Sequence, residues 1–505
     1  MSHSQYVNEK FVEEAKVRGD GLCITSSPDV VNKYHFDEHD LDGIQRHLDQ
    51  RHVQMIAIAG TIGTGLFLGS GQAISRAGPL GALIAYLFIG TVAYATMCSV
   101  GEMTSFAPVS GSFPHFAARW VDPAFGFATG WNYYFTQAVS IPVQISAAQI
   151  ILTFWDPNTK HVPIYITVIC ISMIAANLFA VRLFGESEFF FSIIKLSLIT
   201  GLIIAGLIID LGGRFLATIG VLVQAAFSYG GMEVVAIGAC EARNPRRNVG
   251  RAIRRVFSRV LILYILGILI TGMIIPYDDP NLLNPTGSGT AAQSPYVIVM
   301  NRAGVKVLPH IINACVFTSA FSAGASAPRV FIRTASNGLP ISAVVVSSVF
   351  AFLSYLTVGH GANTVFNWFV ILSSGGGFFG SLSINATYIG FWRGLRAHGI
   401  DRTKFAYFSS LQPYLSIWGT FWLTILILIN GFDVFWTPSV SGFLTAYINI
   451  PLVILLFVGW KMFKRTHWWT PEEMDFVTGI PTIQETEEEE IPPRNLGEKI
   501  AAILF

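Results

Sequence analysis

The chain has 505 residues, of which 52% are hydrophobic and 12% are charged, and its formal net charge is +1. Soluble domains carry about 25% charged residues, so this composition excludes an ordinary soluble protein and indicates a polytopic membrane protein. The near-neutral charge gives no support for nucleic-acid binding. The five cysteines form no CxxC pair, which argues against a metal site or a disulfide framework.

The first 50 residues are polar and charged and lack the apolar period of a helix. We find no cleavable signal peptide in them, so the first membrane helix is expected to direct insertion. Residues 35–39 read HFDEH and match the H-x-x-E-H zinc-peptidase pattern, but that chemistry needs a folded helix and a third ligand. We interpret residues 1–50 as a solvated cytoplasmic tail without a metal site.

An apolar run from about residue 53 to 76 is long enough to cross a bilayer, but its middle is a poor helix interior. Residues 60–65 read GTIGTG, and each glycine costs about 0.5–1 kcal/mol relative to alanine. Unwound backbone survives in hydrocarbon where it lines a cavity or binds a ligand, and the two ends of a broken helix attract opposite charges. The run is therefore a candidate receptor for a zwitterion. The alternative is a helix–helix contact, since Gly65 and Gly69 fit a GxxxG pattern.

Further apolar segments of bilayer length follow the first run. They lie near residues 80–106, 124–154, 162–181, 186–209, 215–239, 256–276, 307–327, 340–358, 366–392, 414–436 and 443–463. Alternate loops hold 18 Lys and Arg residues against five in the opposite loops, so the positive-inside rule places both termini in the cytoplasm. We predict a transmembrane domain over residues 51–465 and a cytoplasmic tail over residues 466–505.

The sixth segment repeats the feature of the first. Residues 227–233 read FSYGGME, with a glycine pair in mid-helix beside an acid. The two interrupted segments are five apart, so segments 1–5 and 6–10 each begin with a break, and an odd number per repeat makes the repeats inverted. Corresponding breaks in inverted halves indicate a transporter site at the bilayer midplane, which favours binding over packing for residues 60–65.

Residues 52–71, HVQMIAIAGTIGTGLFLGSG, resemble the first helix of fungal amino-acid permeases. These permeases form the yeast amino-acid transporter family of the amino acid–polyamine–organocation superfamily. Further stretches resemble the family in the same order, at residues 101–113, 189–196, 241–249, 253–268 and 471–480. The resemblance implies an all-α membrane protein of about twelve transmembrane helices with a five-plus-five inverted repeat (LeuT-type) and broken helices 1 and 6. It also implies proton-coupled import of amino acids at the plasma membrane.

The sequence departs from the family pattern in two places. The external loop between helices 5 and 6 is short, at residues 212–214, and the chain passes from Ala327 to Pro328 where relatives continue the eighth helix. Residues 308–327 give about 30 Å of helix, barely a span, so we expect helix 8 to be shortened. A gene-model error or an inactive paralogue would explain both departures. A non-transporting amino-acid sensor is a further alternative.

The resemblance also assigns roles in the first broken helix. The substrate carboxylate is expected at the N–H groups of Thr64 and Gly65, with Gly63 allowing close approach of the backbone. The substrate ammonium is expected at the carbonyls that end the first half-helix, near Thr61. Contacts of this kind select an α-amino acid and not its side chain.

At the second break, the ammonium is expected to meet carbonyls near Phe227 and Ser228. Selection of the substrate side chain would come from residues around this break, which include Gly231 and, as a wall of the site, Tyr229. The alternative for Tyr229 is an ordinary packed aromatic residue.

Three ionisable residues within the predicted spans stand out, because a charge there costs about 2.5–3.5 kcal/mol and indicates function. Burial would lower the pKa of Lys195, and in related transporters a lysine at this place resembles a proton-operated substitute for sodium. We therefore predict that Lys195 couples transport to protons and that Glu233 links the site to the gate, with Glu102 as a third candidate. The alternative for Lys195 and Glu102 is helix packing.

No P-loop, GxSxG or HExxH motif occurs in the sequence, so we predict no enzyme, no catalytic residue and no cofactor apart from a proton gradient. The expected partners are the amino-acid substrate and anionic membrane lipids, which the arginines of residues 243–259 would contact. Resemblance further implies endocytic regulatory machinery at the tails. Nucleic acid is not expected.

Overall fold

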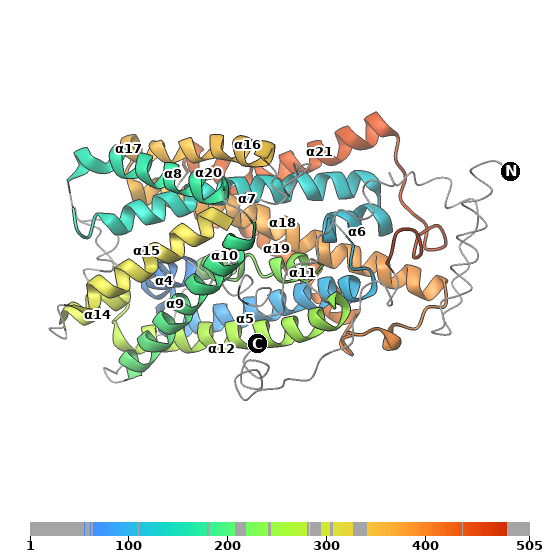
Figure 1. Cartoon of the computed structure of the whole chain (residues 1–505), viewed down its shortest axis with the longest axis horizontal. Coiled ribbons are helices and arrows are strands. Elements are labelled where there is room, and N and C mark those ends of the chain that lie inside the picture. The colour runs from blue at the N-terminus through green and yellow to red at the C-terminus, as the bar shows by residue number, and fades with distance from the viewer. Residues whose placement is uncertain are drawn as a thin grey trace.

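The computed structural model describes residues 55, 61, 64–109, 111–156, 158–178, 181–207, 219–240, 244–279, 282, 294–302, 307–326, 341–436 and 438–481. Within these ranges all regular secondary structure is helical, as the hydrophobic pattern predicts. Most of the long helices run along the long axis of the molecule (Figure 1). The predicted tail at residues 1–50 and both departures from the family pattern, at 212–214 and 327–328, lie outside the described residues.

The described helices follow the predicted apolar segments in order. The first part of the chain forms α4 (Thr64–Phe67), α5 (Gly69–Phe106), α6 (Ser112–Trp120), α7 (Pro123–Leu152), η2 (Thr159–His161), α8 (Val162–Leu178), α9 (Val181–Leu207), α10 (Ile219–Tyr229), α11 (Val234–Cys240) and α12 (Pro245–Ile274). The second part forms α14 (Pro295–Arg302), α15 (Leu308–Ser326), α16 (Ile341–Ala351), η5 (Phe352–Tyr355), α17 (Leu356–His360), α18 (Ala362–Ala397), η6 (Arg402–Lys404), α19 (Tyr414–Ile429), η7 (Phe432–Phe435), α20 (Val440–Tyr447) and α21 (Asn449–Lys464).

Several of these helices are long and apolar enough to cross a membrane. Among the described residues four meet this criterion singly: Gly69–Phe106, Pro123–Leu152, Pro245–Ile274 and Thr364–Ala397. The pair α20 and α21, bent by 44°, meets it as one broken span. Shorter apolar helices lie at Val162–Ala175, Phe190–Ile203, Val346–Gly359 and Tyr414–Ile429. The chain is thus an all-helical membrane protein with several apolar spans, and the number of twelve stays a prediction.

The boundary between the first two predicted segments is a kink inside α5 rather than a loop. Gly78 has a φ of 69°, in the left-handed region that favours glycine, and Pro79 follows it. Gly272 of α12 lies against this kink, because a Cβ at Gly272 would lie 2.5 Å from the Cβ of Pro79. The lack of a side chain at Gly272 therefore allows α12 to pack closely on α5.

Local signals set where helices begin. The Oδ1 atom of Asp122 accepts a hydrogen bond from the N–H of Ala124 at 2.7 Å, and Pro123 occupies the first position of α7. Pro245 likewise begins α12, directly after Asn244. α12 thus starts well before the apolar segment predicted from residue 256, because its first turns carry arginines that lower the hydropathy without interrupting the helix.

Some helices expose an apolar stripe, as a protein in a bilayer requires. On α8, Ile164, Val168 and Ile171 are 58%, 56% and 62% exposed at the i, i+4, i+7 spacing of one helix face. Water-soluble monomers rarely expose such contiguous apolar surface. We take this face of α8 as a lipid-facing surface.

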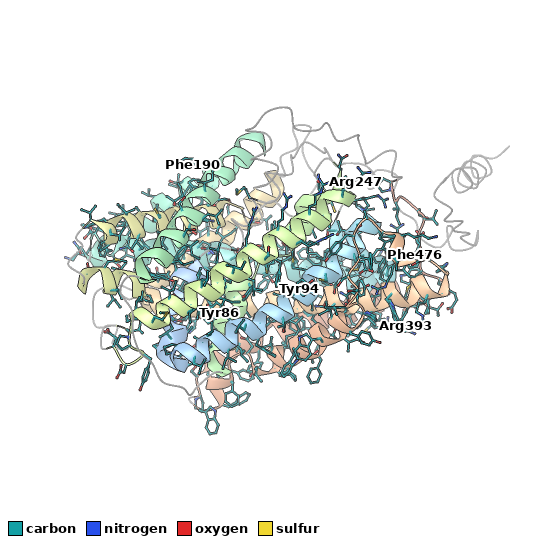
Figure 2. All side chains as sticks on the ribbon, turned by 90° about the horizontal axis from the view of Figure 1, so that it is seen from below. Tyr86, Tyr94, Phe190, Arg247, Arg393 and Phe476 are labelled. Carbon is teal, nitrogen blue, oxygen red and sulfur yellow. The ribbon has the colours of Figure 1, made fainter. Side chains whose placement is uncertain are left out.

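Packing divides the long helices into two neighbouring groups. α5 packs mainly on α10 and α12, and α7 packs mainly on α15 and α18. α5 and α12 also run side by side in both views (Figures 1 and 2). The interrupted segment α10–α11 lies in the first group, next to α5.

Residues 466–481, which we call the C-terminal strap, pack on one end of the helices and do not extend away from them. The buried side chain of Asp475 pairs with the buried Arg119 of α6 at 2.9 Å, and its carbonyl accepts the indole N–H of Trp120 at 3.1 Å. Arg246 of α12 donates to the carbonyl of Pro481 at 2.6 Å. The first part of the predicted cytoplasmic tail is therefore part of the folded body.

Candidate functional site

The sixth predicted segment is interrupted where its glycine pair lies. α10 ends at Tyr229, residues 230–233 form a turn, and α11 begins at Val234. The N–H of Gly230 donates to the carbonyl of Phe227 at 3.2 Å, which tightens the last turn of α10. Gly231 has a φ of 87°, which favours glycine. The break thus falls within the predicted stretch of residues 227–233.

The start of α4 lies directly on this break. A Cβ at Gly65 would lie 2.9 Å from the Oγ of Ser228, 3.0 Å from the Cδ1 of Phe227 and 3.0 Å from the Cα of Ser228. Only glycine allows that approach. α4 begins at Thr64, of which only the backbone is described, and Gly63 lies outside the described residues.

The same surface of α4 and α5 also makes the helix contact that the GxxxG pattern predicts. A Cβ at Gly69 would overlap the Nε2 of Gln224 on α10. Gly65 and Gly69 therefore form one packing seam along α10. The packing and binding interpretations are compatible, because this seam brings the first helix to the break in the sixth.

One hydroxyl joins the two predicted carbonyl groups. The hydroxyl of Tyr264, on α12, lies 2.6 Å from the carbonyl oxygen of Thr61 and 2.6 Å from that of Ser228. All three residues are buried. The structure therefore brings together the predicted residues Thr61, Phe227 and Ser228 with Gly65, around a tyrosine from a third helix.

Tyr229 lies within a group of three packed tyrosines. Its ring centroid is 4.9 Å from that of Tyr264 and 6.2 Å from that of Tyr86 on α5. The Tyr86 hydroxyl lies 3.0 Å from the Oγ of Ser228. Among the described residues the buried hydroxyl of Tyr229 has no hydrogen-bond partner. The packing fits the alternative of an aromatic residue in the core, whereas the unpaired hydroxyl leaves a polar group available beside the break.

Lys195 belongs to α9, and its side chain is buried against α15. Its Nζ donates to the Oγ of Ser322 on α15 at 3.3 Å. One turn earlier on α9, the Oγ of Ser192 donates to the carbonyl of Met55 at 2.8 Å. α9 therefore presents polar groups both to the first predicted helix and to the eighth.

Glu233 and Glu102 occupy different places. Glu233 is partly buried in the turn between α10 and α11, close to the main-chain N–H groups of this turn. Glu102 is fully buried near the end of α5 and pairs with Arg402 at 3.1 Å. It is 16 residues from Tyr86 on the same helix, about 24 Å at 1.5 Å per residue, so the structure does not bring Glu102 to the helix breaks.

Sequence reasoning missed Tyr86 and Tyr264. Tyr264 is a single tyrosine in the aliphatic run LILYILGI, and the need for a buried hydroxyl to find a partner was the available signal. From the sequence, Arg402, the partner of Glu102, is only one of several positive charges in a loop. Its pairing follows from the long-range path of the chain and has no local sequence signal.

A family model described as amino acid permease matches residues 52–327 and 325–471. The chain belongs to the amino acid permease family. The permease is accordingly an integral membrane transporter of amino acids and not an enzyme. The two matched segments overlap at residues 325–327, next to the predicted departure at Ala327 and Pro328.

Three relatives that are named for their substrates match most of the permease. A dicarboxylic amino acid permease of Saccharomyces cerevisiae is 35% identical over 498 residues, covering 88% of this chain and 82% of the relative. A lysine-specific permease of Saccharomyces cerevisiae is 34% identical, covering 91% and 82%. A lysine-specific permease of Escherichia coli is 35% identical, covering 86% and 96%.

A solved structure supports the fold. The manganese transporter of Eremococcus coleocola superimposes with a TM-score of 0.52 at 12% identity, covering 84% of the permease and 98% of that chain. At this identity the likeness concerns the fold alone, which is that of LeuT-like transporters.

Proposed function

We propose that this permease is a secondary transporter that imports amino acids across the plasma membrane by proton symport. Its fold would have about twelve transmembrane helices in a five-plus-five inverted repeat, with both termini in the cytoplasm. The observation that carries the proposal is the contact of α4 with the break between α10 and α11, where Gly65 packs on Ser228. Helix breaks that meet in this way are typical of the substrate site of secondary transporters.

The recognised part of the substrate would be its α-amino and α-carboxyl groups. The carbonyls of Thr61 and Ser228 lie within reach of one hydroxyl, which supports a shared position for an ammonium group. The N–H groups of Thr64 and Gly65 would bind the carboxylate. The relatives carry the names of dicarboxylic and lysine-specific permeases, so main-chain recognition fits a family whose substrates differ in side-chain charge.

The experiment that tests the function is uptake by the purified permease in proteoliposomes. Radiolabelled L-lysine and L-glutamate are offered separately, with and without an inward proton gradient. We expect uptake of at least one of them that rises with the gradient and falls when a protonophore removes it. Uptake that does not respond to the gradient would contradict symport.

Proton coupling is assigned to Lys195, and its buried contact with Ser322 supports a group whose charge matters to the helix pair α9 and α15. In Lys195→Ala the dependence of uptake on external pH should be lost, because the titrating group is gone, while the protein stays folded. The measurement is uptake at two external pH values, beside size-exclusion and melting profiles. Lys404→Ala, at an exposed lysine of η6, is the matched control. Misfolding of Lys195→Ala alone would instead indicate a packing role.

The arginines of α12 support the proposed orientation and lipid contacts of the permease. Arg247, Arg251 and Arg254 are exposed along one stripe of its first turns. In Figure 2, Arg247 lies near the same end of the helices as Phe476 of the strap and Arg393. If this end of the helices faces the cytoplasm, the arginines lie at anionic lipid headgroups and the positive-inside rule is satisfied.

A second candidate is an amino-acid sensor or an inactive paralogue. The observation in its favour is the division of the family match at residues 325–327, at the C-terminal end of α15. Such a protein would bind an amino acid, detected by calorimetry, without carrying it across the proteoliposome membrane. Sequencing the transcript across residues 213–214 and 327–328 tests for a gene-model error.

A further inference from the structure

The hydroxyl of Tyr264 contacts two carbonyl groups that come from parts of the chain far apart in sequence. Thr61 precedes α4, and Ser228 lies in the last turn of α10. The carbonyls of a last helical turn have no intrahelical partner, so the carbonyl of Ser228 needs a donor from elsewhere. A tyrosine hydroxyl carries one proton, which these two oxygens at 2.6 Å share.

We infer that Tyr264 is a positioning residue for the substrate ammonium, an inference that rests on the proposed function of this site. Its hydroxyl holds the carbonyls of Thr61 and Ser228 toward one point. Each carbonyl oxygen has two lone pairs, and the hydroxyl uses no more than one of each. An ammonium carries three N–H donors, so it can bind both carbonyl oxygens at once.

The position of the hydroxyl is fixed by packing. The Tyr264 ring is fully buried and meets the rings of Tyr229 and Tyr86 edge to face, at interplanar angles of 72° and 83°. Tyr86 also binds the side chain of Ser228 at 3.0 Å, and the Ser228 Oγ donates to the carbonyl of Gln224 at 3.2 Å. The rings of Tyr229 and Tyr86 therefore fix the Tyr264 hydroxyl, and the hydrogen bonds of the Ser228 side chain fix the neighbouring carbonyl of Ser228.

The charge of the surroundings selects an ammonium over a carboxylate. The groups that converge on the Tyr264 hydroxyl are carbonyl oxygens, whose partial negative charge attracts a cation and repels an anion. A charged donor also forms the stronger kind of hydrogen bond with a carbonyl. The affinity for an α-amino group should therefore depend on Tyr264 more than the affinity for an α-hydroxyl group does.

Tyr296 on α14 provides a matched control. It is also buried, and its hydroxyl accepts a hydrogen bond from Thr271 at 2.7 Å and donates to the carbonyl of Gly267 at 3.4 Å. Both partners lie inside α12 and neither belongs to a helix break. Tyr296→Phe thus removes a buried hydroxyl next to the same helix without touching the carbonyls of Thr61 and Ser228.

The test compares Tyr264→Phe with Tyr296→Phe in the full-length permease in proteoliposomes. The measured quantities are the KM and maximal rate for radiolabelled L-glutamate or L-lysine, and the inhibition constants of that amino acid and of its α-hydroxy analogue. In Tyr264→Phe we expect the KM and the inhibition constant of the amino acid to rise about tenfold, because a carbonyl that is no longer held in place loses its charge-assisted hydrogen bond with the ammonium. The inhibition constant of the hydroxy analogue should change less than about twofold, as should every constant in Tyr296→Phe.

An unchanged preference for the amino acid over its hydroxy analogue in Tyr264→Phe would overturn the inference, and so would an equal loss of both affinities. If Tyr264→Phe does not fold, Tyr86→Phe decides, since it releases Ser228 from the other side: a reduced preference supports the inference and an unchanged one overturns it. A wild-type permease that neither carries nor binds an amino acid would refute the proposed function itself.

Discussion

At the scale of single residues, Gly65 has the most demanding position. A Cβ at this residue would lie 3.0 Å from the Cα of Ser228, and backbone cannot yield as a flexible side chain can. Alanine is the better helix former by about 1 kcal/mol, so any loss in Gly65→Ala must come from the clash. We expect uptake to fall more than about tenfold with the amount of surface protein unchanged, because the start of α4 is pushed away from the break after Tyr229.

The control for this prediction is Gly377→Ala on α18, where nothing lies within 4 Å of an added Cβ. This variant should keep its uptake and melt at the same or a higher temperature. Wild-type uptake in Gly65→Ala would remove the α4–α10 contact from the transport site.

Glycine spacing located Gly65 and the break after Tyr229, since both depend on local backbone preference. Tyr264 was not predictable in its role, because its two partners are more than 30 residues away in sequence and it reaches them only after three helices have packed. Glu102 shows the same limit. The sequence predicts that burying its charge is costly, but it does not predict that Arg402 is its partner.

At the scale of helices, the ion pair of Glu102 and Arg402 joins the end of α5 to η6. Arg402 also donates to the carbonyl of Gln412 at 2.6 Å and to the hydroxyl of Tyr388 at 3.2 Å, so it connects α18 and the start of α19 as well. These contacts favour the packing interpretation of Glu102 over proton coupling.

In Glu102→Gln we expect a loss of about 1–3 kcal/mol in stability, less than for a fully buried pair because the Arg402 side chain is 21% exposed. The pH dependence of uptake should be retained. Thermal unfolding and uptake at two pH values measure both, with Glu472→Gln at an exposed acid as the control. Loss of pH dependence at an unchanged melting temperature would place Glu102 in the coupling machinery.

Helix boundaries were predicted best where hydropathy and helix ends coincide. The predicted segment 124–154 nearly coincides with α7, because Asp122 caps this helix and Pro123 is its first residue. The prediction of 256–276 missed the first turns of α12, since hydropathy detects the membrane-embedded part of a helix and not its start. An amphipathic pattern of arginines and buried aliphatic residues marked the missing turns.

At the scale of the whole molecule, the C-terminal strap connects the two packing groups. Arg246 at the start of α12 binds the carbonyls of Phe106 on α5 and of Pro481, at 2.9 and 2.6 Å. The Phe476 ring packs against Phe391 of α18, with centroids 5.8 Å apart. Relative motion of α5 and α12 against α18 therefore has to alter contacts of the strap.

Asp475→Asn tests this connection. The side chains of Arg119 and Asp475 are 1% and 6% exposed, and removing one partner of a buried ion pair costs about 3–5 kcal/mol. We expect faster hydrogen exchange in residues 466–481 and a lower melting temperature. An exchange profile identical to the wild type would show that the ring contacts alone hold the strap.

Acidity should not release the strap. Burial alone would raise the pKa of Asp475, but the charge of Arg119 and the N–H groups of Thr478 and Val477 outweigh it and hold the pKa below its ordinary value of about 3.9. The ion pair therefore stabilises the strap fully at any pH above the ordinary pKa of an aspartate. This stabilisation is lost only as the pH falls through the lowered pKa of the folded state. Exchange of residues 466–481, corrected for its intrinsic pH dependence, should therefore match at neutral and mildly acidic pH.

The docking of the strap also determines how the protein can be cut and labelled. A fluorescent or affinity tag keeps these contacts only when it is joined after Pro481. A deletion that begins before Thr466 would uncover the aromatic rings of Trp120 and Phe391, so the cell would degrade a damaged protein. Loss of such a shortened protein from the cell surface would then report unfolding, and a regulatory signal in the tail should be sought only by trimming after residue 481.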